Sequence, residues 1–597
     1  MNIIHRIINN VYRIAVEIFS TAIFALLILL SVVSTCYIAS DSDEVTFFCR
    51  NNFLINFLFL LCILTVIVLY KRLFKNLLEA FLKDDVKFNR ARFILLGIIF
   101  CLSIIWVIVS QVVPGSDQLD VMSCAYKLRY EEYNMLESGG YLDTWRNQLG
   151  LTMIEYYFGK VFGDYNIIGF QLFNCIGILL FYKKVEDILE LLGFERMVQI
   201  LTLFCGIIFI PFIMYTAFVY GNIWSIALAI AAFDSELRFL QNHKWSQMIL
   251  SAVLIGVAYQ VKNNVLIILL AMMTYALVVS MKDKDSFFRG VVYVIACCIV
   301  FFMISKLPNY VLEKKTGYIL NQGVSPWAFV AMGLQDDGAG PGWYNGYNHD
   351  TYYENNCITK LQERQAKEEI DERVNFFIED NHYAFEFFSK KIASMWTEPT
   401  YQAFWIGQIR NHRVNYPAWL DDFMSVGSYT RVASLLGNFQ LFLFFGCLIW
   451  LLLEPKETFV KNSFFILCIV GGFLFHLFWE AKSQYSITYV VLMIPMALQG
   501  FAHLTKWLQE KKIREINMLV LLWGLVIIVS YGGIYKYDQN RCLTADNDIY
   551  AEYVKNFKMP YTNESVLDIN IMKIERNDYK GQSVYYLRLL EENGVIY

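Results

Sequence analysis

Long apolar runs recur along the whole chain and constrain what it can fold into. Many of them hold about 18 to 25 residues with few charges, which is enough for a helix to cross roughly 30 Å of hydrocarbon. Only 17% of the 597 residues are charged, whereas a typical soluble protein carries about 25%. This pattern predicts an all-α polytopic membrane protein.

We predict about thirteen membrane spans. The ends of the apolar runs place them at 14–39, 53–70, 93–113, 165–183, 197–215, 219–234, 247–262, 263–281, 289–308, 431–453, 462–480, 484–505 and 516–535. Lysine and arginine gather on one side of these spans, in 71–92, 183–184, 281–289 and 506–515. Because cytoplasmic loops are enriched in basic residues, we predict a cytoplasmic N-terminus and an extracytoplasmic C-terminus.

This topology divides the chain into five predicted parts. They are a two-helix membrane hairpin with a basic cytoplasmic loop (1–92), a transmembrane core (93–308) whose first external loop is 114–164, a large extracytoplasmic loop (309–430), C-terminal helices (431–535) and an extracytoplasmic tail (536–597). No cytoplasmic segment is long enough for a nucleotide-binding domain, and there is no Walker-type glycine loop, which argues against ATP-driven transport. We therefore expect the functional half of the protein to face outward.

Two aspartates follow the third apolar run directly, in the stretch QVVPGSDQLDVMSCAY. In a structural interpretation, Ser116 caps a helix that begins at Asp117, and acidic residues in the first turn favour the helix dipole. The next residues, including Val121, Ala125 and Leu128, have the spacing of an interfacial amphipathic helix. In a catalytic interpretation, a carboxylate at the boundary between water and membrane takes a proton from an acceptor hydroxyl.

Other short motifs accompany these aspartates. They are GKVFGDYN (159–166), YGN (220–222), YQVKNN (259–264) and WEAKSQY (479–485). Together they resemble the polytopic GT-C glycosyltransferases that use polyprenyl-phosphate sugars, in the branch similar to protein O-mannosyltransferases and to bacterial lipid A and cell-wall-glycan sugar transferases. The resemblance covers roughly residues 93–535 of the chain. The chain departs from the family at Gln484, where a late Glu-x-x-x-Arg-Tyr signature often has arginine.

The resemblance implies a GT-C-like core in a cell membrane, with its active site outside. The implied reaction transfers one sugar, with inversion, from a polyprenyl-phosphate donor to an extracytoplasmic glycan, lipid or protein. Asp117 is then the catalytic base and Asp120 its helper or alternative. The sequence indicates no metal site, no cofactor and no nucleic-acid partner; besides the substrates, the expected partners are membrane lipids.

The leaving group of such a reaction is a lipid phosphate, so cations should lie where its negative charge develops. The candidates on the external side are Lys262, Lys482, Arg129 and Arg146. Candidate substrate-binding residues are Gln118, Asn147, Gln148, Tyr220, Asn264, Glu480, Gln484 and Tyr485.

Each of these residues also has a structural interpretation. Lys262 can snorkel from the end of a span to the interface, Glu480 and Lys482 can be solvated charges in a turn, and Asn147 and Gln148 can cap a loop. Two other functions stay open: a polysaccharide polymerase or ligase, and a transporter of lipid-linked glycans. The chain shows no internal repeat of the kind common in transporters, and the first-loop aspartates favour the transferase.

Overall fold

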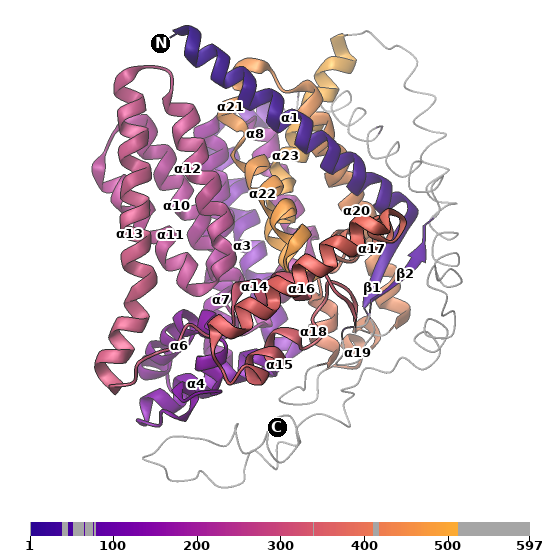
Figure 1. Cartoon of the computed structure of the whole chain (residues 1–597). Coiled ribbons are helices and arrows are strands. Elements are labelled where there is room, and N and C mark those ends of the chain that lie inside the picture. The colour runs from indigo at the N-terminus through magenta and orange to yellow at the C-terminus, as the bar shows by residue number, and fades with distance from the viewer. Residues whose placement is uncertain are drawn as a thin grey trace.

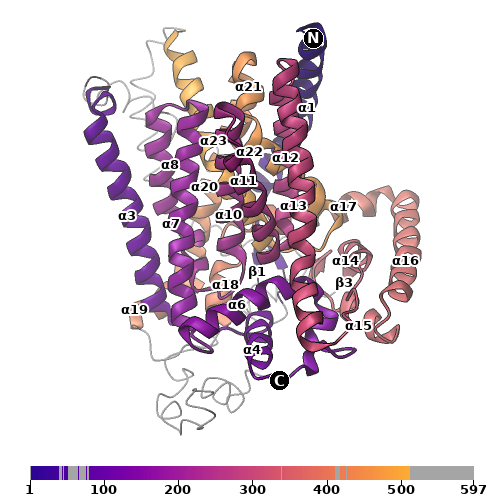
Figure 2. The ribbon, with the colours of Figure 1, turned by 90° about the vertical axis from the view of Figure 1, so that its left-hand side faces the viewer.

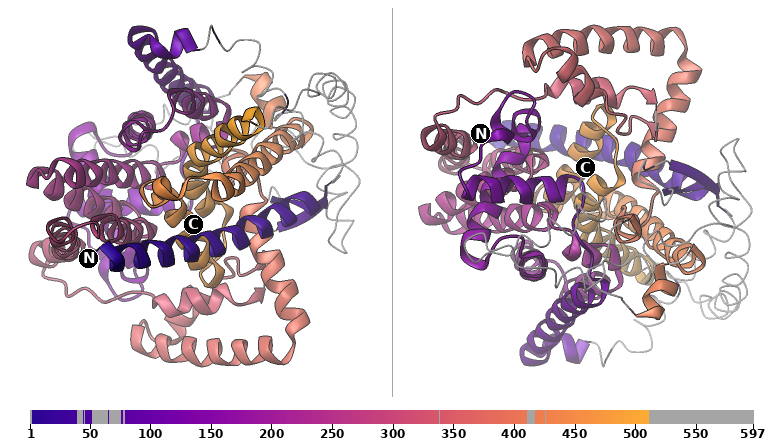
Figure 3. Two further views of the ribbon diagram at one scale, coloured as in Figure 1. Left: turned by 90° about the horizontal axis from the view of Figure 1, so that it is seen from above. Right: turned by 90° about the horizontal axis from the view of Figure 1, so that it is seen from below.

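A computed structural model of the chain describes residues 2–38, 44, 46–51, 65, 76, 79–337, 339–409, 417–424 and 426–510. These residues form a bundle of long helices, and a lobe of shorter helices projects from one side of it (Figure 1, Figure 3). All but one residue of the predicted span 53–70 lie outside the described residues, as do the predicted span 516–535 and the tail 536–597.

Seven described helices are long and apolar enough to cross a membrane. They are α1 (Asn2–Val33), α3 (Asp85–Ser110), α7 (Ile167–Leu192), α12 (Leu266–Ser280, with the turn from Asn263), α13 (Lys284–Thr316), α20 (Val426–Leu453) and α23 (Ser483–Glu510). Two bent pairs raise the number to nine if each is one span. These are α8 (Arg196–Ile208) with the segment Ile210–Ala217, which holds α9 (Ile210–Met214), and α21 (Lys456–Asn462) with α22 (Phe464–Phe478). The prediction of a helical membrane protein is therefore confirmed.

Two further predicted spans form helices that do not meet these criteria. The helix α11 (Trp245–Val261) is apolar but has only 17 residues. The helix α10 (Asn222–Asn242) continues past the predicted end of its span through Asp234 and Glu236, and most of its residues are buried by neighbouring helices. It packs against α7 and α11, so it forms the interior of the bundle.

Two short antiparallel sheets were not predicted. Strands β1 (Ser34–Ile38) and β2 (Thr46–Arg50) form a hairpin where the first span was expected to continue to residue 39. The β-branched and aromatic residues of STCYI favour an extended strand. The hairpin is also held from outside, because the Thr46 amide donates to the Ala339 carbonyl at 2.8 Å. Strands β3 (Asp336–Asp337) and β4 (Gly340–Pro341) form the second sheet.

Local signals set the ends of the long helices. Asp84 accepts hydrogen bonds from the amides of Val86 and Lys87 and so begins α3. Asn166 begins α7 in the same way, and α7 ends at Gly193, whose φ of 80° suits glycine. These helices alternate in direction through the bundle (Figure 2). As a result, the connections that follow α3, α9, α11, α13 and α22 all meet at one end of the molecule.

That end carries most of the short helices (Figure 1). The predicted first external loop forms α4 (Asp117–Arg129), α5 (Tyr141–Thr144) and α6 (Leu149–Phe162). The predicted large loop begins only after α13 ends at Thr316. It forms α14 (Pro326–Gly333), α15 (Tyr347–Glu354), α16 (Thr359–Glu379), α17 (Asn381–Trp396), α18 (Ala403–Ile409) and α19 (Ala418–Met424). The longest of these helices is α16, with 21 residues.

Candidate functional site

The helix α4 begins at Asp117, as the sequence predicts, but Ser116 does not cap it through its side chain. Ser116 has a φ of 50° and a ψ of −140°, so its hydroxyl is not aimed at the amides of the first turn. Pro114 and the left-handed Gln111, with a φ of 54°, end α3 just before this turn. The sharp break places both aspartates of α4 at the end of the bundle.

One face of α4 packs onto the protein. Val121, Ala125 and Leu128, predicted to form the apolar face of an interfacial helix, are buried against neighbouring protein segments. Gln118 is also buried, and its Oε1 accepts a hydrogen bond from the amide of Val219 at 2.8 Å. This bond fixes the start of α4 beside the turn that leads into α10. Gln118, predicted to bind substrate, thus ties two segments of the chain together.

Asp117 lies at the edge of a group of tyrosines. Tyr141 of α5 donates to Asp117 Oδ1 at 3.4 Å. Tyr220 lies close enough to feel the charge of Asp117. Burial, and then this charge, raise the pKa of Tyr220 well above the ordinary value. Gln148 donates to the hydroxyl of Tyr220. The structure therefore brings the predicted residues Asp117, Gln148 and Tyr220 together.

Lys262 reaches the same place from the end of α11. Its Nζ donates to Asn222 Oδ1 at 2.8 Å and lies 5.6 Å from the ring centre of Tyr220 and 5.5 Å from that of Tyr485. Burial, with the nearby charge of Lys482, lowers the pKa of Lys262 to about 7. A snorkelling lysine would place its ammonium in water, whereas this one is held among protein groups.

Lys482 enters from the turn between α22 and α23 and is surrounded by carboxylates. Its Nζ lies 3.1 Å from Glu44 Oε2 and 3.9 Å from Glu480 Oε1. Burial lowers the pKa of Lys482, but the charges of Glu44, Glu480 and Asp117 outweigh burial and hold that pKa above its ordinary value. Tyr485 donates to Glu480 Oε2 at 3.1 Å. We call Asp117, Lys262, Lys482, Glu480 and Glu44 the acid–lysine cluster.

The turn that carries Lys482 is anchored from behind. Lys391 of α17 donates to the carbonyl of Trp479 at 2.8 Å and to that of Gly333. The buried carboxylate of Glu398 accepts from Ser483 Oγ at 2.8 Å and from the amides of Thr400 and Gln402. These contacts join the lobe to the start of α23 and fix the backbone of this turn.

Asp120 lies one helical turn after Asp117 and remains in contact with solvent. Desolvation by the surrounding protein, together with the charge of Asp117, raises the pKa of Asp120 to about 6. Two carboxylates this close cannot both ionise as readily as one alone. The pair can therefore hold or take up a proton near neutral pH, which general acid–base chemistry requires.

Other predicted residues lie around the cluster rather than in it. Arg129 forms an ion pair with Asp164 at the far end of α4. Arg146 donates to the carbonyl of Leu142, and burial lowers the pKa of Arg146. Asn147 is exposed beside Arg146, and Asn264 lies in the turn after Lys262. The backbone amide of Gln484 donates to Gln402 Oε1 at 3.3 Å.

Sequence reasoning missed Glu44, Tyr141 and Asn222. Glu44 was overlooked because it precedes residue 93, where the resemblance begins. Tyr141 lacks a motif, and only Asn222 falls inside one, as the last residue of YGN. Across the part of the chain that the structure describes, no three His, Cys, Asp or Glu side chains converge in a way that could hold a metal ion.

Comparison with known proteins gives no family for this arrangement. No protein-family model matches the chain, and no curated protein is significantly similar to it.

Proposed function

We propose that the protein is a membrane glycosyltransferase that moves a sugar from a polyprenyl-phosphate donor to an extracytoplasmic acceptor. The acceptor classes are a cell-surface polysaccharide, a teichoic acid or a lipid. The single observation that carries this proposal is the acid–lysine cluster. It joins a carboxylate at the mouth of the bundle to two lysines that come from different turns at the same end.

The cluster has the two kinds of group that this reaction needs. Asp117 supplies a base near solvent, where an acceptor hydroxyl can arrive. Lys262 and Lys482 supply positive charge at one end of the long apolar helices, where we expect the donor's lipid phosphate to bind. Lys482 does not make the donor site by itself, because Glu44 and Glu480 already neutralise its charge. Lys262 has only the neutral Asn222 amide as its hydrogen-bond acceptor among the described contacts.

The proposed chemistry is a single displacement. Asp117 takes the proton of the acceptor hydroxyl as the acceptor oxygen attacks the anomeric carbon of the sugar. The bond between that carbon and the phosphate oxygen breaks, and its electron pair leaves with the polyprenyl phosphate. Lys262 and Lys482 meet the charge that develops on this phosphate, and the configuration of the sugar inverts.

The test is the content of lipid-linked sugars in cells that carry or lack the protein. Deletion should cause one polyprenyl-phosphate sugar to accumulate and one extracytoplasmic glycan or lipid to lose that sugar, because donor is made but no longer used. Reintroducing the wild-type chain should reverse both changes. If deletion leaves the pool of lipid-linked sugars and the surface glycans unchanged, the proposed function is wrong.

A further inference from the structure

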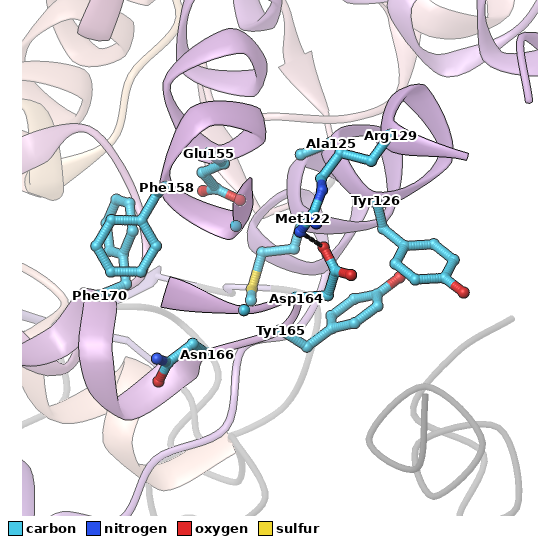
Figure 4. Close-up of a pocket in the computed structure, with 12 residues that line it drawn as sticks. Met122, Ala125, Tyr126, Arg129, Glu155, Phe158, Asp164, Tyr165, Asn166 and Phe170 are labelled. Atoms are coloured by element: carbon cyan, nitrogen blue, oxygen red, sulfur yellow. Dashed lines mark hydrogen bonds and ion pairs between the residues drawn. The ribbon is translucent and has the colours of Figure 1, made fainter. Parts of the chain in front are cut away.

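A second site lies on the other side of α4. It is a small pocket, open to solvent on one side, between α4, α6 and the turn that leads into α7 (Figure 4). Apolar and aromatic groups make most of its wall, among them Met122, Tyr126, Phe158 and Phe170. The acid–lysine cluster does not use this pocket.

The pocket contains a buried acid without a partner. Glu155 of α6 is only 6% exposed, and its Oε1 has no hydrogen-bond partner among the described residues. Burial raises the pKa of Glu155 well above the ordinary value. The buried Glu398 differs, because it accepts several hydrogen bonds. An unpaired buried carboxyl is costly, and this one lines an open cavity.

The other charges of the pocket are already matched. Arg129 and Asp164 form an ion pair at its edge, as Figure 4 shows. An anionic ligand would therefore find no unpaired cation, and an apolar ligand would leave the carboxyl of Glu155 unsatisfied. A primary ammonium group has N–H donors for this carboxylate, and its charge is attracted to the faces of aromatic rings such as Phe158 and Tyr126.

We propose that this pocket binds a primary ammonium group with Glu155 as its counter-ion. The surroundings favour a lipid headgroup as the source of that group. Val161 and Phe162 at the end of α6 are 71% and 61% exposed, and Ile168 at the start of α7 is 46% exposed. Large apolar side chains at the junction of α6 with the candidate membrane span α7 mark a surface suited to lipid. Glu155 lies in α6, just before the turn that leads into α7, so a headgroup at the end of this span could reach it.

The test uses the full chain in phosphatidylcholine nanodiscs and native mass spectrometry of the lipids that it retains. Phosphatidylethanolamine, which has a primary ammonium, should be retained at least tenfold over phosphatidylglycerol, which has hydroxyls instead. Phosphatidylcholine, whose ammonium has no N–H, should also bind poorly. Glu155→Gln should abolish the preference, Glu155→Asp should keep part of it, and Glu132→Gln, at an exposed position beyond α4, should leave it unchanged. Free ethanolamine distinguishes a lipid headgroup from a free amine as the ligand. It displaces the lipid only if the ammonium group alone is sufficient for binding.

The pH dependence gives a second readout. Since a proton on Glu155 competes with the ammonium, wild-type affinity should fall as the pH is lowered, and Glu155→Gln should have a flat profile. Glu155→Gln separates the titration of Glu155 from that of the other groups that face it. These groups are Cys124, Tyr126 and Arg129 of α4, Asp164 and Tyr165 of the turn, and Tyr220. Equal retention of all three lipids by the wild type, or an unchanged preference in Glu155→Gln, would overturn the proposal. Neither result depends on sugar transfer, which Asp117→Asn should remove while it leaves lipid retention intact.

Discussion

At the scale of single residues, Lys262 is the group whose charge the site controls most closely. Its pKa of about 7, lowered from the ordinary value by burial and by Lys482, means that it is charged below pH 7 and loses its charge above it. If Lys262 binds the donor phosphate, donor affinity should be constant below pH 7. Above it, affinity should fall about tenfold for each pH unit. The measurement is the KM for the lipid-linked donor between pH 6 and pH 9.

Substitutions at the two lysines separate their contributions to this profile. Lys262→Met should lower kcat/KM by about 30- to 1,000-fold, from roughly 2 to 4 kcal/mol of lost charge stabilisation, and should remove the alkaline limb. Lys482→Met should also slow transfer but keep that limb and move it to higher pH, because the charge of Lys482 helps to lower the pKa of Lys262. If donor affinity still falls above pH 7 in Lys262→Met, the titrating group is not Lys262.

Glu44 gives a second prediction at this scale. Glu44→Gln leaves Lys482 with Glu480 at 3.9 Å as its carboxylate partner, so the ammonium is held less firmly. The pair is partly exposed, and we expect transfer to slow about 3- to 10-fold, from roughly 1 kcal/mol. Glu79→Gln is the matched control, because Glu79 pairs with the highly exposed Lys83. Equal rates in both variants would make Glu44 a spectator.

The residues that could be predicted are those whose position follows from topology. Asp117, Lys262 and Lys482 each lie at the end of an apolar run, and alternation of spans puts such ends on one side. Glu44 and Tyr141 could not be found in this way. Their places depend on how the β1–β2 hairpin and α5 fold back, and those contacts join residues far apart in the sequence.

At the scale of helices, the close contact between α20 and α23 rests on glycine. A Cβ on Gly500 would lie 2.1 Å from the carbonyl oxygen of Gly446, so neither backbone could keep its place. Gly500→Val should therefore separate the helices and lower the melting temperature markedly, since overpacking costs about 1 to 3 kcal/mol or more. Gly97→Val in α3 is the control, because nothing lies within 4 Å of its added Cβ. Similar melting temperatures of Gly500→Val and Gly97→Val in detergent would refute this account of the packing.

Long apolar helices were the most predictable elements, because hydrophobic length alone indicates them. The exceptions have physical reasons. The first helix ends at Val33 instead of residue 39, because STCYI pairs with β2 and docks on the lobe. The helix α10 is buried by α7 and α11, so contacts with other helices override the criterion of apolar length.

At the scale of the whole molecule, the proposed orientation can be tested by cysteine labelling. In a background without exposed native cysteines, Glu372→Cys on the exposed side of α16 should react with an impermeant reagent in intact cells. Lys83→Cys, just before α3 at the other end of the bundle, should react only after the membrane is opened. The reverse pattern would place the acid–lysine cluster in the cytoplasm and contradict the proposed acceptors.

The measurement that tests the central claim most directly is sugar transfer by Asp117→Asn. The purified chain in nanodiscs is given the lipid-linked sugar that accumulates on deletion, and release of polyprenyl phosphate is followed. The wild type should turn over, and Asp117→Asn should retain less than about 1% of that rate, because loss of a general base costs roughly 100- to 10,000-fold. Asp120→Asn should retain more activity than Asp117→Asn. Wild-type turnover by Asp117→Asn would contradict the account.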